Sequence, residues 1–302
     1  MTLNKNPNEK GLLRSDEFMI CVENLKKSYK EVDAVRGISF NVKSKTLFSF
    51  LGTNGAGKST TINILTTLLE KSSGTVKIDG LDLDMNATDI RKLIGVVFQE
   101  SVLDPELTVY ENLRVRGSLY GLKGKELKMA VQRVINLTGM EDYENRYYGK
   151  LSGGQRRRAD IARTLIHTPK LLFLDEPTTG LDPKTRQDIW DLILRLKDEN
   201  EMTIFLTTHY MEEAVKSDDI AIIHKGKILA AGTPAELKEK YGFDRLKMTL
   251  QDGELLEYKL KHTTDALPII EEMKGKIVHV EIISGTLDEV FINLTGGGID
   301  VN

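Results

Sequence analysis

The chain has 302 residues, of which 40% are hydrophobic and 29% are charged, a composition typical of a globular protein and too apolar for a disordered one. Its 42 Lys and Arg residues nearly balance its 45 Asp and Glu residues, so the net charge of -3 provides no general basic surface for nucleic acid. The single cysteine excludes an intramolecular disulfide and favours a reducing compartment. No apolar run approaches the roughly 20 residues that cross a bilayer, so we expect no membrane-spanning segment.

A polar N-terminal segment and three strands are predicted within the first 51 residues. Residues 1–16 are polar and lack the apolar region of a secretory signal, so we expect a disordered tail. Strands are predicted over 17–22 and 38–42, where apolar residues alternate with polar ones. The next run, Leu47–Leu51, is almost continuously apolar, which is typical of a strand buried on both faces of a parallel sheet.

A glycine-rich loop follows this strand directly, and a segment with apolar residues at helical spacing follows the loop. Residues 52–59 match the pattern G-x-x-x-x-G-K-S, and this setting is the one that a phosphate-binding loop requires. Backbone N–H groups of such a loop surround a phosphate, and the helix adds the positive end of its dipole. We expect Lys58 to bind the β- and γ-phosphates of a nucleotide and Ser59 to coordinate Mg²⁺. The residues that we assign to nucleotide binding here are Gly52, Thr53, Asn54, Gly55, Ala56, Gly57, Lys58, Ser59 and Thr60.

Predicted strands and helices alternate over the rest of the chain up to about residue 242. The strands are predicted over 94–98, 171–174, 203–206 and 220–223, and the helices over 125–137, 155–166 and 183–196. This alternation predicts the α/β class with a mainly parallel sheet.

Two carboxylates end the predicted strand over 171–174. Parallel strands deliver their carboxyl ends to the ligand crevice of an α/β sheet, so Asp175 and Glu176 are expected to face the nucleotide. Asp175 is the candidate Mg²⁺ partner, and Glu176 is the candidate base that polarises the attacking water. Together with the glycine loop, this pair predicts nucleotide hydrolysis.

A second motif that can bind phosphate is Leu151–Gln155, with the sequence L-S-G-G-Q. Ser152 is a favourable N-cap, and the helix that follows directs its dipole toward an anion. Through this motif the sequence resembles the ATP-binding subunit of ABC transporters, in which it is the signature motif. The resemblance implies ATP and Mg²⁺ as cofactors and a P-loop NTPase core of the ABC type. That core carries an antiparallel β subdomain, a helical subdomain and a small α+β C-terminal appendix.

The resemblance also implies a domain division and further site residues. The ATPase domain covers residues 17–242, with its helical subdomain at about 100–168, and an accessory segment covers 243–302. The resemblance implies that Tyr29 stacks on adenine and that Gln99 senses and binds Mg²⁺. It implies that Asp182 couples two sites and that His209 contacts the γ-phosphate. The residues that it assigns to contact with a partner's nucleotide are Ser152, Gly153, Gly154 and Gln155. The sequence departs from the family at Thr53, usually Pro, and at Lys45-Thr46, usually Gly-Glu, but none of these positions supplies the phosphate chemistry.

Each motif occurs once, and in this family the signature loop of one copy closes over the phosphate loop of another. The resemblance therefore implies a second copy or a paralogous ATPase subunit as partner, and a separate integral membrane permease that docks near Gln99 and the helical segment over 107–137. It places the chain in the cytoplasm, on the inner face of the membrane. Residues 108–113, 119–122 and 286–296 are similar to the drug-resistance and ABC-2 exporter branch, which implies export of a drug, a lipid or a polysaccharide.

Two other functions use parts of these motifs. A soluble ABC-type ATPase acting on ribosomes or nucleic acid is disfavoured, because such proteins usually carry two cassettes or a long coiled coil, and the net charge is negative. A metabolic kinase is disfavoured by the signature motif and His209. The basic run Arg156–Arg158 begins the signature helix, and we expect it to form a solvated or interdomain face and not a nucleic-acid contact.

Overall fold

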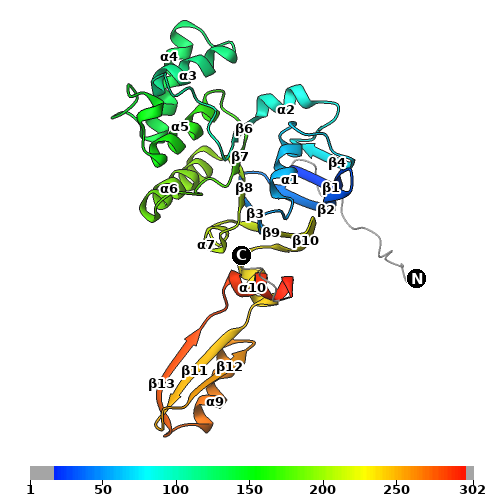
Figure 1. The fold of residues 1–302 in the computed structure, drawn as a ribbon, viewed down its shortest axis with the longest axis vertical. Helices are drawn as coiled ribbons and strands as arrows, with labels where there is room; N and C mark the ends of the chain where they lie inside the picture. The colour runs from blue at the N-terminus through cyan, green and yellow to red at the C-terminus, as the bar shows by residue number, and fades with distance from the viewer. Residues whose placement is uncertain (1–16, 297–302) are drawn as a thin grey trace, which may run out of the picture.

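Residues 17–296 are described by a computed structural model, in which three β-sheets organise the chain (Figure 1). The predicted tail over 1–16 lies outside the described residues. The largest sheet contains β3 (Leu47–Leu51), β6 (Ile94–Val97), β7 (Leu171–Asp175), β8 (Thr203–Thr208), β9 (Asp219–His224) and β10 (Lys227–Gly232). The helices around it are α1 (Lys58–Leu65), α2 (Ala87–Leu93), α3 (Val109–Leu119), α4 (Gly124–Thr138), α5 (Gly153–Leu165), α6 (Pro183–Asn200), α7 (Met211–Ala214) and α8 (Pro234–Tyr241).

The strand order of this central sheet is β10-β9-β3-β8-β7-β6. All its neighbouring pairs are parallel except β9 and β10, which are antiparallel. β3 lies between β8 and β9 and is buried along its whole length, as its continuous apolar sequence predicts. The carboxyl ends of the parallel strands meet at one edge, where the predicted site residues follow them. The predicted α/β class is confirmed.

An antiparallel sheet packs beside the central one. Its order is β2-β1-β4-β5, formed by β1 (Phe18–Tyr29), β2 (Val32–Lys43), β4 (Ser73–Ile78) and β5 (Leu81–Asp82). The first strand is longer than the predicted 17–22 because register shifts let it continue to Tyr29. A cluster of phenylalanines joins the two sheets, since the ring of Phe40 lies 5.4 Å from that of Phe50 and 6.1 Å from that of Phe205.

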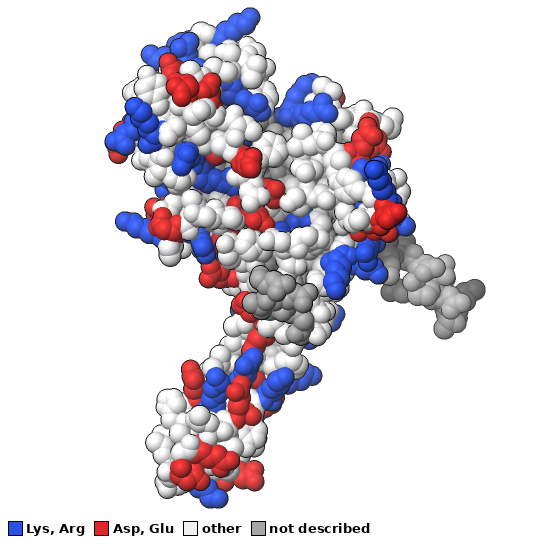
Figure 2. All heavy atoms as spheres, in the orientation of Figure 1, with Lys and Arg blue, Asp and Glu red and all other residues white. Residues whose placement is uncertain are grey.

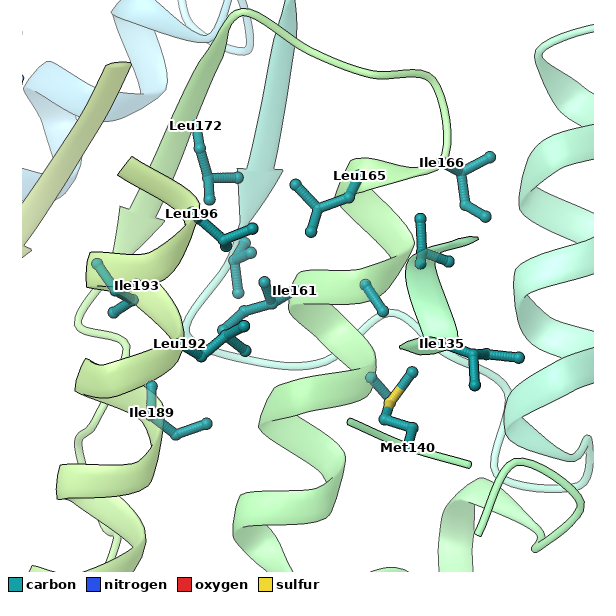
Figure 3. Packing of buried hydrophobic residues seen from close by; sticks show 14 of the residues in the cluster. Ile135, Met140, Ile161, Leu165, Ile166, Leu172, Ile189, Leu192, Ile193 and Leu196 are labelled. Carbon is teal, nitrogen blue, oxygen red and sulfur yellow. The ribbon is translucent and has the colours of Figure 1, made fainter. Parts of the chain in front are cut away.

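Helices α3, α4 and α5 form a separate helical region beside β6 and β7 (Figure 1). Figure 3 shows side chains of α5, among them Ile161 and Leu165, that pack toward those of α6, among them Ile189 and Leu192. These residues are buried, and they belong to one hydrophobic core with the strand β7. The predicted helices over 125–137, 155–166 and 183–196 are confirmed to within a few residues at each end.

The third sheet follows α8 and extends away from the rest of the molecule (Figure 1). Its order is β12-β11-β13, from β11 (Asp244–Leu250), β12 (Leu255–Leu260) and β13 (Ile277–Ile283), and α9 (Ala266–Glu272) packs on it. The last helix, α10 (Leu287–Thr295), returns to the central sheet, where Phe291 is buried in one cluster with Ile222 of β9. The domain division after residue 242 stays a prediction, and the apolar face of α10 packs on the core, while its Glu289 pairs with Arg245 of the small sheet.

Residues 17–296 contain no membrane-spanning helix, and the face drawn in Figure 2 carries charges of both signs. Among residues 17–296, no helix is long and apolar enough to cross a membrane. On the face drawn in Figure 2, Lys and Arg are interspersed with Asp and Glu over the helical region, the core and the small sheet.

Candidate nucleotide-binding and hydrolysis site

A cavity of about 560 Å³ lies at the carboxyl edge of the central sheet, at the start of α1. The segments that follow β3, β6, β7 and β8 all contribute to its wall. Its lining residues are Ala34, Asn54, Gly55, Gly57, Lys58, Ser59, Thr60, Gln99, Glu176, Thr179 and His209. The structure thus brings together most of the predicted phosphate loop, Gln99, Glu176 and His209. Ala34 and Thr179 were missed by the sequence analysis because neither belongs to a pattern that marks a site.

The glycine loop joins β3 to α1 and depends on glycine at two positions. A Cβ atom at Gly52 would lie 2.4 Å from the backbone oxygen of Ile223, so no side chain fits there. Gly57 is the N-cap of α1 and has a φ of 107°, a conformation that other residues rarely adopt. The loop therefore turns tightly against β9 and leaves the N-terminus of α1 directed at the cavity. Helix N-termini of this kind favour anions.

Lys58 is the cation of this cavity, and its side chain is 4% exposed. Its Nζ atom donates hydrogen bonds to the carbonyl oxygens of Gly52 at 2.9 Å and Thr53 at 3.2 Å, and it lies 3.4 Å from Oε1 of Glu176. Burial lowers the pKa of Lys58, whereas the neighbouring Glu176 carboxylate opposes that shift. The ammonium group is thus held beside the loop, where phosphates would bind.

Glu176 follows β7 and links the two other functional side chains. Its Oε1 atom lies 3.4 Å from Nζ of Lys58 and 3.2 Å from Nδ1 of His209, while Oε2 accepts a hydrogen bond from Thr179 Oγ1 at 3.2 Å. Burial alone would raise the pKa of Glu176, but the charge of Lys58 and the contact with His209 outweigh it, so this pKa lies below its usual value. The carboxylate is ionised at neutral pH and can accept a hydrogen bond from water.

The predicted Mg²⁺ donors are oxygen atoms, which this cation prefers. Ser59 and Gln99 line the cavity, whereas Asp175 does not line it and its Oδ1 accepts a hydrogen bond of 2.5 Å from Thr207. Burial raises the pKa of Asp175, although the hydrogen bond from Thr207 opposes this shift. In the described residues, no group of three or more His, Cys, Asp or Glu could hold a metal. Such a sparse donor set fits Mg²⁺ bound jointly by phosphates and water, and it would not hold the ion without them.

The signature residues lie away from this cavity, at the N-terminus of α5. Ser152 and Gln155 form a capping box, with each side chain bonded to the backbone N–H of the other residue. Asp182 caps α6 by accepting a hydrogen bond from Thr185 N at 3.1 Å. A Cβ atom at Gly154 would lie 2.2 Å from Cγ2 of Thr185, so the starts of α5 and α6 are in close contact. Ser152–Gln155, Asp182 and the predicted adenine-stacking residue Tyr29 do not line the cavity of their own chain.

Two buried charged residues that hold this site were missed by the sequence analysis. Arg157 is buried and donates to backbone carbonyls after β6 and β7, so the expectation of a solvated or interdomain face for the basic run is wrong at this position. Glu213 of α7 accepts hydrogen bonds from the hydroxyl groups of Thr178 and Thr208. Thr178 lies two residues after Glu176, and Thr208 lies directly before His209. Their roles depend on where α5 and α7 pack, which no local pattern reveals.

Comparisons with known proteins match this chain to one family. A family model described as ABC transporter matches residues 35–179. The chain is 37% identical over 304 residues to the daunorubicin/doxorubicin resistance ATP-binding protein DrrA of Streptomyces peucetius, covering 91% of this chain and 92% of that protein. It is 39% identical over 307 residues to the linearmycin resistance ATP-binding protein LnrL of Bacillus subtilis, covering 92% and 98%. It is 34% identical over 295 residues to the Nod factor export ATP-binding protein I of Burkholderia lata, covering 92% and 97%.

A solved structure supports the same assignment. The dimeric post-hydrolysis state of the ATP-binding cassette MJ0796, bound to ADP and Pi, matches with a TM-score of 0.65 and 30% identity, covering 71% of this chain and 98% of that one. The central and antiparallel sheets and the helical region are therefore those of an ATP-binding cassette, and the predicted fold class is confirmed in this respect as well.

Proposed function

The chain belongs to the ABC transporter family, and we propose that it is the ATP-hydrolysing subunit that powers a separate membrane permease. The observation that carries this proposal is the convergence of the glycine loop, Lys58, Glu176 and His209 on one cavity. A cation beside the loop, an ionised carboxylate and an imidazole are the groups that binding and hydrolysis of a nucleoside triphosphate require.

The residues of this cavity divide the work of hydrolysis. Lys58 binds the β- and γ-phosphate oxygens, and the N-terminus of α1 stabilises their charge. Glu176 orients the attacking water and accepts its proton, and His209 contacts the γ-phosphate while holding the Glu176 carboxylate. Bound Mg²⁺, held by Ser59, Gln99 and, through water, Asp175, would neutralise charge on the phosphates.

A complete site requires a second chain. The exposed N-terminus of α5, with Ser152 and Gly153, does not face the cavity of its own chain, so it is free to bind the nucleotide of another. The partner is a second copy or a paralogous ATPase subunit, and ATP bound between the two chains holds them together. Hydrolysis then separates them and provides the mechanical stroke.

The permease binds at a groove of about 390 Å³ whose lining includes Phe98, the residue before Gln99. The groove lies between the α1–α2 region and the helical region, and its floor is apolar while its rim carries cations. Its lining residues are Thr66, Leu68, Thr88, Arg91, Lys92, Ile94, Val96, Phe98, Arg116, Tyr120 and Arg163. An apolar floor next to a residue of the hydrolysis site is suited to a permease segment whose movement must be coupled to ATP.

The transported molecule is a drug, a lipid or a polysaccharide, and the chain works at the inner face of the cell membrane as part of an ABC-2 type exporter. This part of the proposal is supported by the names of the relatives, which are resistance and export ATP-binding proteins that match over nearly their whole length.

The substitution Glu176→Gln tests the function, because it keeps the shape of the side chain and removes its charge. We expect the variant to bind ATP, to lose at least about 100-fold in hydrolysis rate and to elute as a dimer from gel filtration with ATP. Glu100→Gln, an exposed carboxylate after Gln99, is the matched control and should behave as wild type. A Glu176→Gln variant that stays monomeric with ATP and hydrolyses it normally would contradict the proposal.

Cross-linking tests the permease groove. Leu68→Cys places a thiol at a groove position that is 60% exposed, and Met85→Cys places one at an exposed position outside the groove. Both variants also carry Cys21→Ser, which removes the only native thiol. In native membranes, a bifunctional thiol–amine reagent should join the chain to an integral membrane protein from Leu68→Cys and not from Met85→Cys.

A further inference from the structure

Arg157 is a buried cation whose partners are all backbone carbonyls. It is 7% exposed and lies in the second turn of α5. Its Nε donates to Pro177 O at 2.7 Å and its Nη1 to Phe98 O at 2.6 Å, while Nη2 donates to Asp175 O at 2.9 Å and to Glu176 O at 3.1 Å. One side chain thus joins the end of β6, the loop after β7 and the signature helix.

These partners flank two residues of the hydrolysis site. Phe98 immediately precedes Gln99, and the other three carbonyls belong to Glu176 and its two neighbours. The planar guanidinium group presents several donors in a fixed arrangement, which allows it to bond carbonyls on both segments at once. A lysine ammonium group at the same position could not match this geometry.

The backbone of Glu176 has an unusual conformation that needs such support. Its φ is 44°, in the left-handed region that residues other than glycine rarely adopt. Its N–H donates to Thr207 O at 3.2 Å on one side, and its carbonyl accepts from Arg157 on the other. This backbone conformation directs the carboxylate toward Lys58 and His209.

Burying a cation is costly, so its position needs a reason beyond stability. A buried charged group is often no more stabilising than an apolar residue of similar size. Burial lowers the pKa of Arg157, which reflects this cost. The neighbouring residue Arg156 is exposed, so within the basic run over 156–158 only Arg157 is buried.

We propose that Arg157 is a positioning residue for ATP hydrolysis, which holds Glu176 and Gln99 in a fixed relation to the signature helix. This inference rests on the proposed function, since it requires Glu176 to act on the attacking water. Arg157 does not contact the phosphate loop, so it supports the chemical step and not nucleotide binding. Because Arg157 and Ser152 belong to one helix unit, the signature motif and the hydrolysis site of the same chain are mechanically linked.

The test compares Arg157→Gln with the matched control Arg156→Gln. We expect Arg157→Gln to lower kcat for ATP by about 10- to 100-fold, since small displacements of catalytic groups have effects of this size. Its KM and its affinity for a fluorescent ATP analogue should stay within about threefold of wild type, and Arg156→Gln should match wild type in every respect. A role in general stability would instead lower affinity and kcat together.

A double-mutant cycle decides whether Arg157 acts through Glu176. Residues that act as a unit are not additive, so Arg157→Gln should have little further effect on single-turnover hydrolysis in the Glu176→Gln background. An equal fold-loss in both backgrounds would overturn the proposal, and so would a wild-type kcat in Arg157→Gln. If Arg157→Gln does not fold, Arg157→Lys replaces it in the same cycle. This variant keeps the positive charge and loses the planar arrangement of N–H donors.

Failure of this inference can be told apart from failure of the proposed function. The proposed function fails if the wild-type chain does not hydrolyse ATP or if Glu176→Gln hydrolyses it normally. The positioning role fails on its own when those two proteins behave as expected while Arg157→Gln keeps its kcat or loses nucleotide affinity.

Discussion

The Nζ atom of Lys58 lies 3.4 Å from Oε1 of Glu176, so the residue proposed to bind phosphate and the residue proposed to orient water form an ion pair inside one cavity. Both side chains are mostly buried. The Glu176 carboxylate opposes the lowering of the Lys58 pKa by burial, and the charge of Lys58 lowers the pKa of Glu176. Under the proposed function, a γ-phosphate that binds Lys58 would therefore lie next to the Glu176 carboxylate. This relationship joins two motifs that lie far apart in the sequence.

Replacing Lys58 should abolish productive nucleotide binding. Lys58→Ala removes the cation of the cavity and leaves Glu176 without its closest charge, so we expect ATP affinity to fall by at least about 100-fold, the loss of one or two charge-assisted hydrogen bonds. Isothermal titration calorimetry measures this directly. Lys45→Ala, an exposed lysine paired with Glu201, is the control and should bind ATP as wild type does. Unchanged affinity in Lys58→Ala would reject the phosphate-binding role.

The helical region should become unstable in alkali because of buried tyrosines. Burial raises the pKa of Tyr143 from 10.0 to about 12, and its hydroxyl has no hydrogen-bond partner among the described residues. Because the pKa of Tyr143 is higher in the folded state than in the unfolded state, its ionisation does not affect the free energy of unfolding below pH 10.0. As the pH rises from 10.0 toward 12, the unfolded state ionises first and the free energy of unfolding falls. Tyr148 has a similarly raised pKa of about 12 and adds to the effect.

Tyr143→Phe tests this prediction because it removes the unpartnered hydroxyl and keeps the ring. We expect its free energy of unfolding at pH 7 to equal or exceed that of wild type, within about 1 kcal/mol. Its loss of stability between pH 10 and about 12 should be smaller than in wild type. Tyr147→Phe, at an exposed position, is the control. Urea titrations at each pH give both quantities, and parallel losses in all three proteins would show that Tyr143 does not titrate as described.

The last helix should stabilise the ATPase core, although it follows the small sheet. Phe291 of α10 is buried in one cluster with residues of β3, β9 and α8. Phe291→Ala should lower the free energy of unfolding by about 3–5 kcal/mol, as for other large buried residues. Its neighbour Ile292 is 38% exposed, so Ile292→Ala should cost less than about 1.5 kcal/mol. Equal midpoints for the two variants in urea would contradict the packing of α10 on the core.

Much of the cavity could be predicted because its residues belong to local patterns. The glycine loop follows a fully apolar strand, and Glu176 and His209 each follow another strand of the same sheet. Parallel strands end at one edge, so their positions in the sequence predict their meeting in space. The signature residues and Asp182 lie at the starts of α5 and α6, outside the cavity of their own chain.

What the sequence did not reveal depends on packing between distant segments. Arg157 stands in a basic run that is typical of a solvent-exposed helix start, and it is buried only because α5 packs against the loops after β6 and β7. Glu213 follows another glutamate in sequence, and its partners are hydroxyl groups of the loop after β7 and of the end of β8. Helix α10 has ordinary amphipathic spacing, which cannot tell which of two nearby surfaces it covers.

Under the proposed function, one chain carries two half-sites, and a second chain completes each of them. Lys58→Ala removes the phosphate-loop half, and Gly153→Asp places a carboxylate at the exposed start of α5, where it repels the partner's nucleotide. Mixing the two inactive variants in equal amounts forms heterodimers with one intact composite site.

The most direct measurement is therefore ATP hydrolysis by this mixture, compared with each variant alone and with wild type. If half of the random dimers are mixed and each has one working site of two, we expect about a quarter of the wild-type rate, or less if the two sites must act together. A mixture as inactive as either variant alone, or a Gly153→Asp chain that hydrolyses ATP like wild type, would contradict the composite site.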